Sequence, residues 1–120
     1  MAEAAVRRDW AESHEDVVVR YLRANIRALH WLYDPANRVE ALAILEQYTK
    51  TQPDYAERTY DLLVTRLQMF ARNGELDPAA FESTMQVLVD EGELAAPAPP
   101  VSKYLDTHYW DQAIATVGRQ

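Results

Sequence analysis

Apolar residues recur along most of this chain at spacings of three and four, the period of an amphipathic α-helix with one buried face. The clearest run follows Ser13, which is expected to cap the helix by accepting a hydrogen bond from a first-turn amide. Arg20, Arg23 and Arg27 fall on another side of this helix, where their charged heads can reach water. The apolar positions of this first helix are Val18, Tyr21, Leu22, Ile26, Leu29, Leu32 and Tyr33.

Asp34 and Pro35 predict the end of this helix and the start of a second one. Proline disfavours helical geometry for the residue before it and suits the first position of a new helix. Asp34 is therefore expected to cap the second helix, with Glu40 and Glu46 facing solvent. The buried face predicted for the second helix consists of Ala41, Leu42, Ile44, Leu45 and Tyr48.

Two further helices are predicted from the same signals. The third begins at Pro53 and ends at Asn73–Gly74, because glycine readily takes the left-handed conformation of a helix stop. The fourth begins at Pro78, is capped by Asp77, and ends near Glu91–Gly92. The inward residues expected for the third helix are Ala56, Tyr60, Leu63, Val64, Leu67 and Phe70, flanked by Leu62 and Met69. Those for the fourth are Phe81, Met85, Leu88 and Val89.

The C-terminal part begins with Ala95–Pro100, which is too rich in proline for a regular helix and should form an extended arm with polyproline character. A turn near Lys103–Asp106 and a short helix over about Thr107–Thr116 should follow. We therefore expect a single all-α domain whose four main helices form two antiparallel hairpins. Its parts are a lead of coil or helix (1–9), the four-helix body (10–92), the arm (93–101) and a docking tail (102–120).

Charge and composition narrow the possible partners. The chain has 120 residues and a net charge of −7, which argues against binding to a nucleic-acid backbone or an anionic membrane. It has no cysteine, so disulfides and thiolate chemistry are excluded. No window approaches the roughly 20 apolar residues of a membrane span. No signal peptide is recognisable at the N-terminus, so the chain as it stands is expected in the cytoplasm.

Candidate chemistry is sparse. His14 is expected to be a solvated first-turn residue, and His30 a histidine near a helix end. His108 has Asp106 and Asp111 close in sequence, but two or three local donors without a remote partner are a weak metal signal. No serine lies in a nucleophile elbow, no glycine-rich loop is present, and no acid–base pair is recognisable. We expect no enzyme activity, no metal and no cofactor.

The aromatic residues are expected mainly in the core, since they fall at helical spacing. Tyr109 and Trp110 are the exception, because two adjacent bulky side chains are not expected to face one core. One of them should be exposed, at an interface or a pocket rim. Together with His108, they are the candidate ligand-binding residues that the sequence offers.

Seven segments also carry a family resemblance. They resemble, in order, the C-terminal helical part of substrate-binding proteins of ABC importers, the group for nitrate, sulfonate, taurine and thiamine precursors. This resemblance implies a type II periplasmic binding protein fold, a permease partner, a small solute and a periplasmic location for the full-length protein. The segments are Trp10–Ala11, His14–Val18, Leu22–Ala24, Ala28–Arg38, Tyr60–Leu63, Phe70–Leu76 and Ser102–Asp106.

The chain also departs from that family, because the sheets that would form most of the ligand cleft are not recognisable in it. Two function hypotheses follow. The first is a non-catalytic solute-binding component of an ABC importer, or its C-terminal portion. The alternative is a stand-alone helical dimerisation or interaction module that has lost ligand binding. An apolar face that would have packed on a sheet must be covered, so we expect a homodimer, with exchanged tails as one arrangement.

Overall fold

The computed structural model describes residues 5–120, and in that range it contains six α-helices and no β-strand. The predicted all-α class is therefore confirmed. The helices are α1 (Arg8–Ser13), α2 (Glu15–Tyr33), α3 (Arg38–Thr49), α4 (Pro53–Tyr60), α5 (Pro78–Asp90) and α6 (His108–Val117). Three short turns join them: the 3₁₀ turns η1 (Pro35–Asn37) and η3 (Val101–Lys103), and the π turn η2 (Asp61–Arg66). The first four residues of the predicted lead lie outside the described range.

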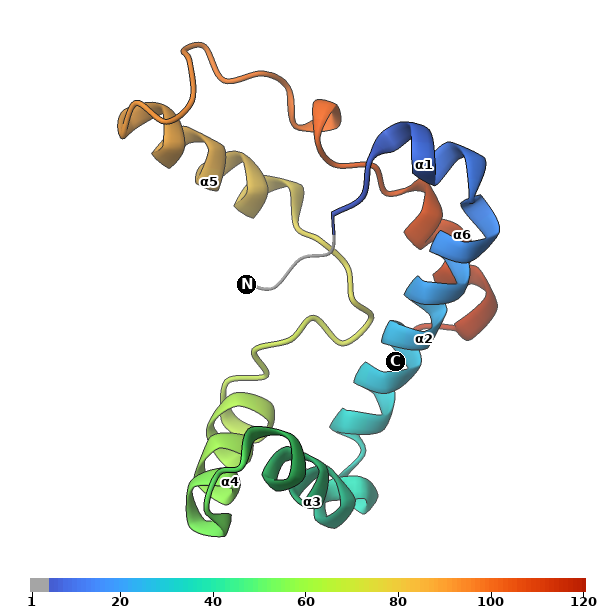
Figure 1. Ribbon diagram of the computed structural model, residues 1–120, viewed down its shortest axis with the longest axis vertical. Helices are drawn as coiled ribbons and strands as arrows, with labels where there is room; N and C mark the ends of the chain where they lie inside the picture. The colour runs from blue at the N-terminus through green and yellow to red at the C-terminus, as the bar shows by residue number, and fades with distance from the viewer. Residues whose placement is uncertain (1–4) are drawn as a thin grey trace.

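The main packing contact is that of α6 against α2, side by side in Figure 1. The docking tail and its short helix are thus where the sequence placed them. The face predicted for α2 is buried or half-buried at every position except Tyr21, which is 52% exposed, and Val19, which was not predicted, is buried. Two residues turn a helix by about 200°, so these side chains must point in opposite directions. The buried cluster here is Ala11, Val19, Ile26, Tyr109, Ala113 and Ile114.

The start of α2 also differs from the prediction. Ser13 is the last residue of α1, and its hydroxyl lies 2.9 Å from the carbonyl oxygen of Asp9 and 3.0 Å from that of Trp10. His14 occupies the N-cap position of α2, with φ −134° and no side-chain capping bond. The predicted Ser13 cap is wrong because a helical turn upstream, α1, engages the hydroxyl.

The second packing unit lies at the other end of α2. Asp34 forms a cap, accepting a hydrogen bond of 2.9 Å from the amide of Ala36, but it caps the short turn η1, and the N-cap of α3 is Asn37. Arg38 then bridges to Glu57 at 3.0 Å and Asp61 at 3.1 Å, which fixes α3 against α4. The buried residues are Ala41, Tyr60 and Val64, with Trp31, Leu32, Tyr33 and Leu42 packed against them.

The outer part of the face predicted for α3 is not covered. Ile44 is 41% exposed and Tyr48 is 78% exposed, so the prediction that both are buried is wrong. Only one side of α3 meets α4, and among residues 5–120 no helix packs on its other apolar side. This end of the molecule therefore presents apolar side chains to solvent.

The third helix is shorter than predicted, because α4 passes into η2 and ends at Arg66. Gly74 does take a positive φ of +68°, but within a loop of residues 67–77 and not at a helix end. The loop is anchored instead by Tyr33, whose hydroxyl donates to the carbonyl oxygen of Phe70 at 2.7 Å. As a result Leu67 and Met69, expected inside, are 59% and 63% exposed.

Helix α5 begins as predicted, with the Asp77 carboxylate accepting from the amide of Ala79 at 2.9 Å. Met85 is buried, and Gly92 follows the helix with φ +78°. Among the elements of residues 5–120, α5 packs mainly against the short turn η3, and it projects away from the other helices (Figure 1). The pairs are thus α2 with α6 and α3 with α4, while α5 stands apart.

Candidate functional site

The first candidate site lies where the N-terminus of α6 meets α1 and α2. The ring of His108 contacts the Asp106 carboxylate through Nδ1 at 2.7 Å, and its Nε2 lies 3.9 Å from the Glu15 carboxylate. Arg8 reaches the other Asp106 oxygen at 3.5 Å and donates to the carbonyl oxygen of Lys103 at 3.1 Å. The cluster therefore ties the start of α6 to α1 and α2, which come from the other end of the chain.

Two pKa values in this cluster are shifted. The hydrogen bond from His108 lowers the pKa of Asp106, the amide of His108 and the charge of Arg8 act in the same direction, and burial opposes them. Burial raises the pKa of Tyr109, and the neighbouring carboxylates, Asp106 first, add to that effect. Asp106 is therefore held as a carboxylate and Tyr109 as a neutral phenol.

This arrangement suits an electrostatic clamp better than a reactive centre. In the described part of the chain, both polar partners of the His108 ring are carboxylates, so the ring has no hydroxyl or thiol to activate. Within residues 5–120, no group of three or more His, Cys, Asp or Glu side chains is placed to hold a metal ion. What the cluster does is hold α6 in place.

Trp110 points to the other side of α6. Its indole Nε1 donates to the carbonyl oxygen of Asn73 at 2.8 Å, and the Arg119 guanidinium lies 5.0 Å from its ring centre. Tyr109 is buried and Trp110 is half-buried, so neither is the exposed aromatic that the sequence led us to expect. Both fit because α6 lies between two surfaces, the α1–α2 core and the loop carrying Asn73.

A polar contact that the sequence reading missed centres on Asn73, a buried residue that was interpreted only as part of a helix stop. Its side-chain oxygen accepts from His30 Nε2 at 3.0 Å and from the amide of Gln120 at 3.0 Å. His30 is also buried, with 9% of its surface exposed. We call Asn73, His30, Trp110 and Gln120 the Asn73 hub. No local sequence pattern predicts the hub, because the three residues that contact Asn73 lie 37 to 47 positions away from it in the sequence.

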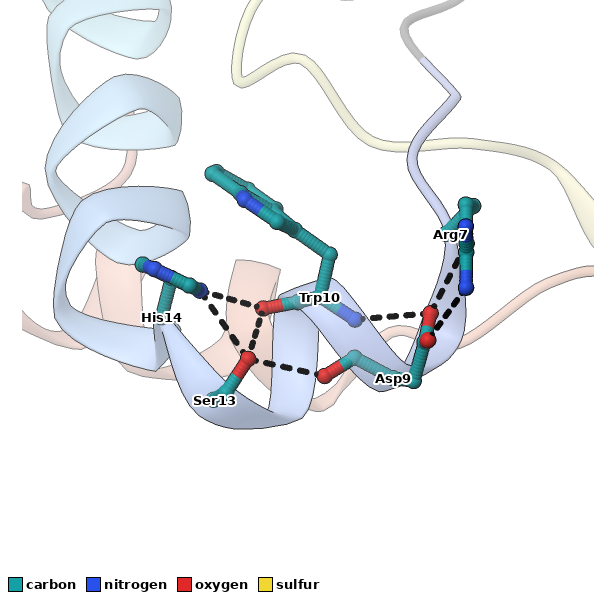
Figure 2. A network of polar contacts seen from close by, with 5 residues as sticks. All are labelled: Arg7, Asp9, Trp10, Ser13 and His14. Carbon is teal, nitrogen blue, oxygen red and sulfur yellow. Dashed lines mark hydrogen bonds and ion pairs between the residues drawn. The ribbon is translucent and has the colours of Figure 1, made fainter.

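A second candidate site is the surface of α1, shown in Figure 2. The rings of Trp10 and His14 stack with their centroids 4.6 Å apart and their planes 9° from parallel. His14 Nδ1 lies 2.9 Å from the carbonyl oxygen of Trp10 and 3.0 Å from the Ser13 hydroxyl. His14 is exposed, as expected, but its ring has an aromatic partner. A surface hollow of about 480 Å³ adjoins this network, lined by Val6, Arg7, Asp9, Trp10 and Ser13.

A second hollow of about 770 Å³ runs along the outer surface of α2 and α6. Arg20, Arg23 and Val19 line it together with Gln112 and Thr116 of α6, and carboxylates line it too. The carboxylates are Glu12, Glu15 and Asp16. His108, Tyr109 and Trp110 line neither hollow, so the three candidate ligand-binding residues contact the protein itself and do not share a pocket.

Comparison with known proteins identified no relative of this chain. No protein-family model, no curated protein and no solved structure matches the chain. The resemblance to substrate-binding proteins therefore stays a prediction from the sequence. None of the helices in the described part of the chain is long and apolar enough to cross a membrane.

Proposed function

We propose that this chain is a non-catalytic solute-binding component of an ABC importer for small anionic or organic solutes, or the C-terminal portion of one. The observation that carries the proposal is the ordered set of sequence segments that resemble that family. The permease of such an importer is the partner that this function implies.

The roles of those segments in the fold add support. Asp34 caps η1, and Asn37 donates from its side chain to the carbonyl oxygen of Trp31 at 2.9 Å. Asn73 and Lys103, from two later segments, hold α6 and α1. Residues of these segments thus lie at the joints between helices.

The hollow beside α1 offers the best chemistry for a small solute. Trp10 supplies an apolar wall, Arg7 a guanidinium, and Ser13 a hydroxyl. The hollow has a volume of about 480 Å³ and is open to solvent. The Asp9 carboxylate now pairs with Arg7, so an anionic solute would replace a carboxylate at that guanidinium.

Thermal unfolding against a panel of nitrate, taurine, alkanesulfonates, bicarbonate and a thiamine pyrimidine tests this proposal. A ligand at 100 times its dissociation constant adds about 2.7 kcal/mol to a two-state fold. We expect one class of solute to raise the midpoint, and R7A and W10A to abolish that rise. The matched control R58A, which removes an exposed arginine of α4, should retain it. A cooperatively unfolding protein that responds to no compound would contradict the proposal.

The alternative function, a helical dimerisation or interaction module, is favoured by a different observation. Apolar side chains of the α3–α4 end, α5 and the loop between them are exposed. Val39 is 80% exposed, Tyr55 60% and Val87 53%. A large apolar surface typically marks a protein interface. In this function the partner is a second copy, and the molecular mass in solution tests it independently of any solute.

A further inference from the structure

Acidic residues are concentrated in one part of the chain. Between Arg72 and Lys103 there is no lysine or arginine, although this stretch holds six of the 19 acidic residues. We call residues 78–100, which comprise α5 and the arm, the acidic flap. The acidic residues of the stretch are Glu75, Asp77, Glu82, Asp90, Glu91 and Glu93. The other 13 acidic residues (19 less six) nearly balance the 12 lysines and arginines, all of which lie outside this stretch.

In the described part of the chain, no other helix packs closely against the acidic flap. Within the described residues, α5 packs mainly on η3, which directly follows the arm. Val87 is 53% exposed and Leu88 39% exposed. Figure 1 shows α5 at the upper left and α3 with α4 at the bottom, while α2 and α6 run along the right-hand side. The flap therefore presents both negative charge and apolar surface.

The molecule is less compact than a typical protein of its length and therefore exposes more surface. The radius of gyration is 17.1 Å, whereas a compact chain of this length has about 13.6 Å. The accessible area is 8734 Å², against about 6,600 Å² for a compact protein of this mass. The surplus of about 2,100 Å² per chain lies in the range that each subunit of an obligate homodimer buries.

A complementary surface lies on α2. Arg20, Arg23 and Arg27 form a stripe on one side of this helix, which we call the arginine stripe, and the first two line the 770 Å³ hollow. Arg20 pairs with Asp16 at 2.9 Å, and in residues 5–120 no ion pair forms at Arg23 or Arg27. The acidic side chains of the hollow, such as Glu12, lie toward the N-terminal end of α2. The stripe beyond them is free for a negative partner.

We propose that the acidic flap of one copy lies along the arginine stripe of a second copy, and that the contact is made twice around a two-fold axis. This inference rests on the dimerisation function above. The spacing fits, because Glu82 and Asp90 are about 12 Å apart along α5 while Arg20 and Arg27 are about 10.5 Å apart along α2. The exchanged element is thus the flap, since the tail already docks on α2 of its own chain.

Sedimentation equilibrium of charge-reversed variants tests the contact. The unaltered chain should sediment at twice its 13.8-kDa mass. R23E/R27E and E82K/D90K should each dissociate at least about tenfold more readily. An equimolar mixture of the two variants should recover the dimer, because the mixed dimer has one contact with the original charges and one in which both charges are reversed. The matched control R58E/R66E, which reverses two exposed arginines of α4 and η2, should remain a dimer.

The outcomes separate the two levels of the proposal. A dimer that R23E/R27E leaves intact would overturn the flap–stripe contact but keep the dimerisation function. An unaltered chain that sediments as a monomer would overturn both, whether its flap stays free or folds onto its own α2. Circular dichroism of each variant, together with the mixture, distinguishes lost association from lost folding. Solute binding is measured separately and is unaffected by either result.

Discussion

Replacing Asn73 by alanine tests whether the Asn73 hub holds the loop, α2 and the C-terminal helix together. The side-chain oxygen accepts two hydrogen bonds of 3.0 Å, from His30 Nε2 and from the amide of Gln120. N73A removes that acceptor and leaves the buried His30 donor without a partner, which costs about 1–3 kcal/mol. The Gln120 amide can turn to water, so its loss adds about 0.5–1.5 kcal/mol at most. The contact between Trp110 and the backbone of Asn73 remains.

We therefore expect N73A to lower the free energy of unfolding by about 2–3 kcal/mol. The entropy of unfolding of a chain of this length is about 0.25 kcal/mol/K, so the midpoint should fall by about 8–12 °C. Scanning calorimetry measures both quantities. N73D keeps an acceptor oxygen for His30 and should recover much of the loss. The control N25A truncates an exposed asparagine of α2 and should change little. A loss from N73A no larger than that from N25A would refute the role of the hub.

Three further predictions concern the buried core, a helix cap and the loss of stability at low pH. I26A removes the largest fully buried side chain and should cost about 2–5 kcal/mol in urea unfolding, whereas V39A, at an 80% exposed position, should cost less than about 0.5. D34A should cost about 1 kcal/mol by calorimetry, since the η1 cap is lost. The pKa of Asp106 is lowered in the folded protein, so its contribution to stability is present above the unfolded pKa and is lost as pH falls through the lowered value. Accordingly, the stability difference between the unaltered chain and D106N should shrink from pH 7 toward pH 2, and a difference independent of pH would contradict that assignment.

The features that were predicted correctly from the sequence depend on residues that lie close together in the chain. Both Asp–Pro steps form caps, at Asp34 and at Asp77, because the carboxylate and the proline act within three residues. The tail helix was placed within one residue at each end. These signals need no knowledge of the tertiary structure, although the equally local Ser13 cap failed because a further helical turn, α1, lies upstream.

Features that depend on distant contacts were beyond local patterns. Whether Val19 or Tyr21 faces inward on α2 is decided by where α6 docks, and α6 comes from the other end of the chain. The early end of the third helix at Arg66 leaves a loop whose anchors, Tyr33 and His30, lie on α2. Tyr109 and Trp110 are both covered because two separate surfaces flank α6.

The candidate site was predicted only in part for the same reason. His108 and Asp106 were correctly seen as neighbours, since they are two residues apart in sequence. Glu15 and Arg8, which complete that cluster, are brought there by the fold. The stacking of Trp10 on His14 follows from their i, i+4 spacing, but the hollow beside them depends on how the chain enters α1.

The central claim is that α2 and α6 form a stable body, whereas α5 is packed only when two copies associate. Hydrogen exchange measured over a range of protein concentrations tests this claim most directly. We expect the amides of α2 and α6 to be strongly protected at every concentration. The amides of α5 should exchange quickly in dilute solution and slowly once copies associate. Equal and strong protection of α5 at the lowest concentration would contradict the account, because it would mean that α5 is already packed within a single chain.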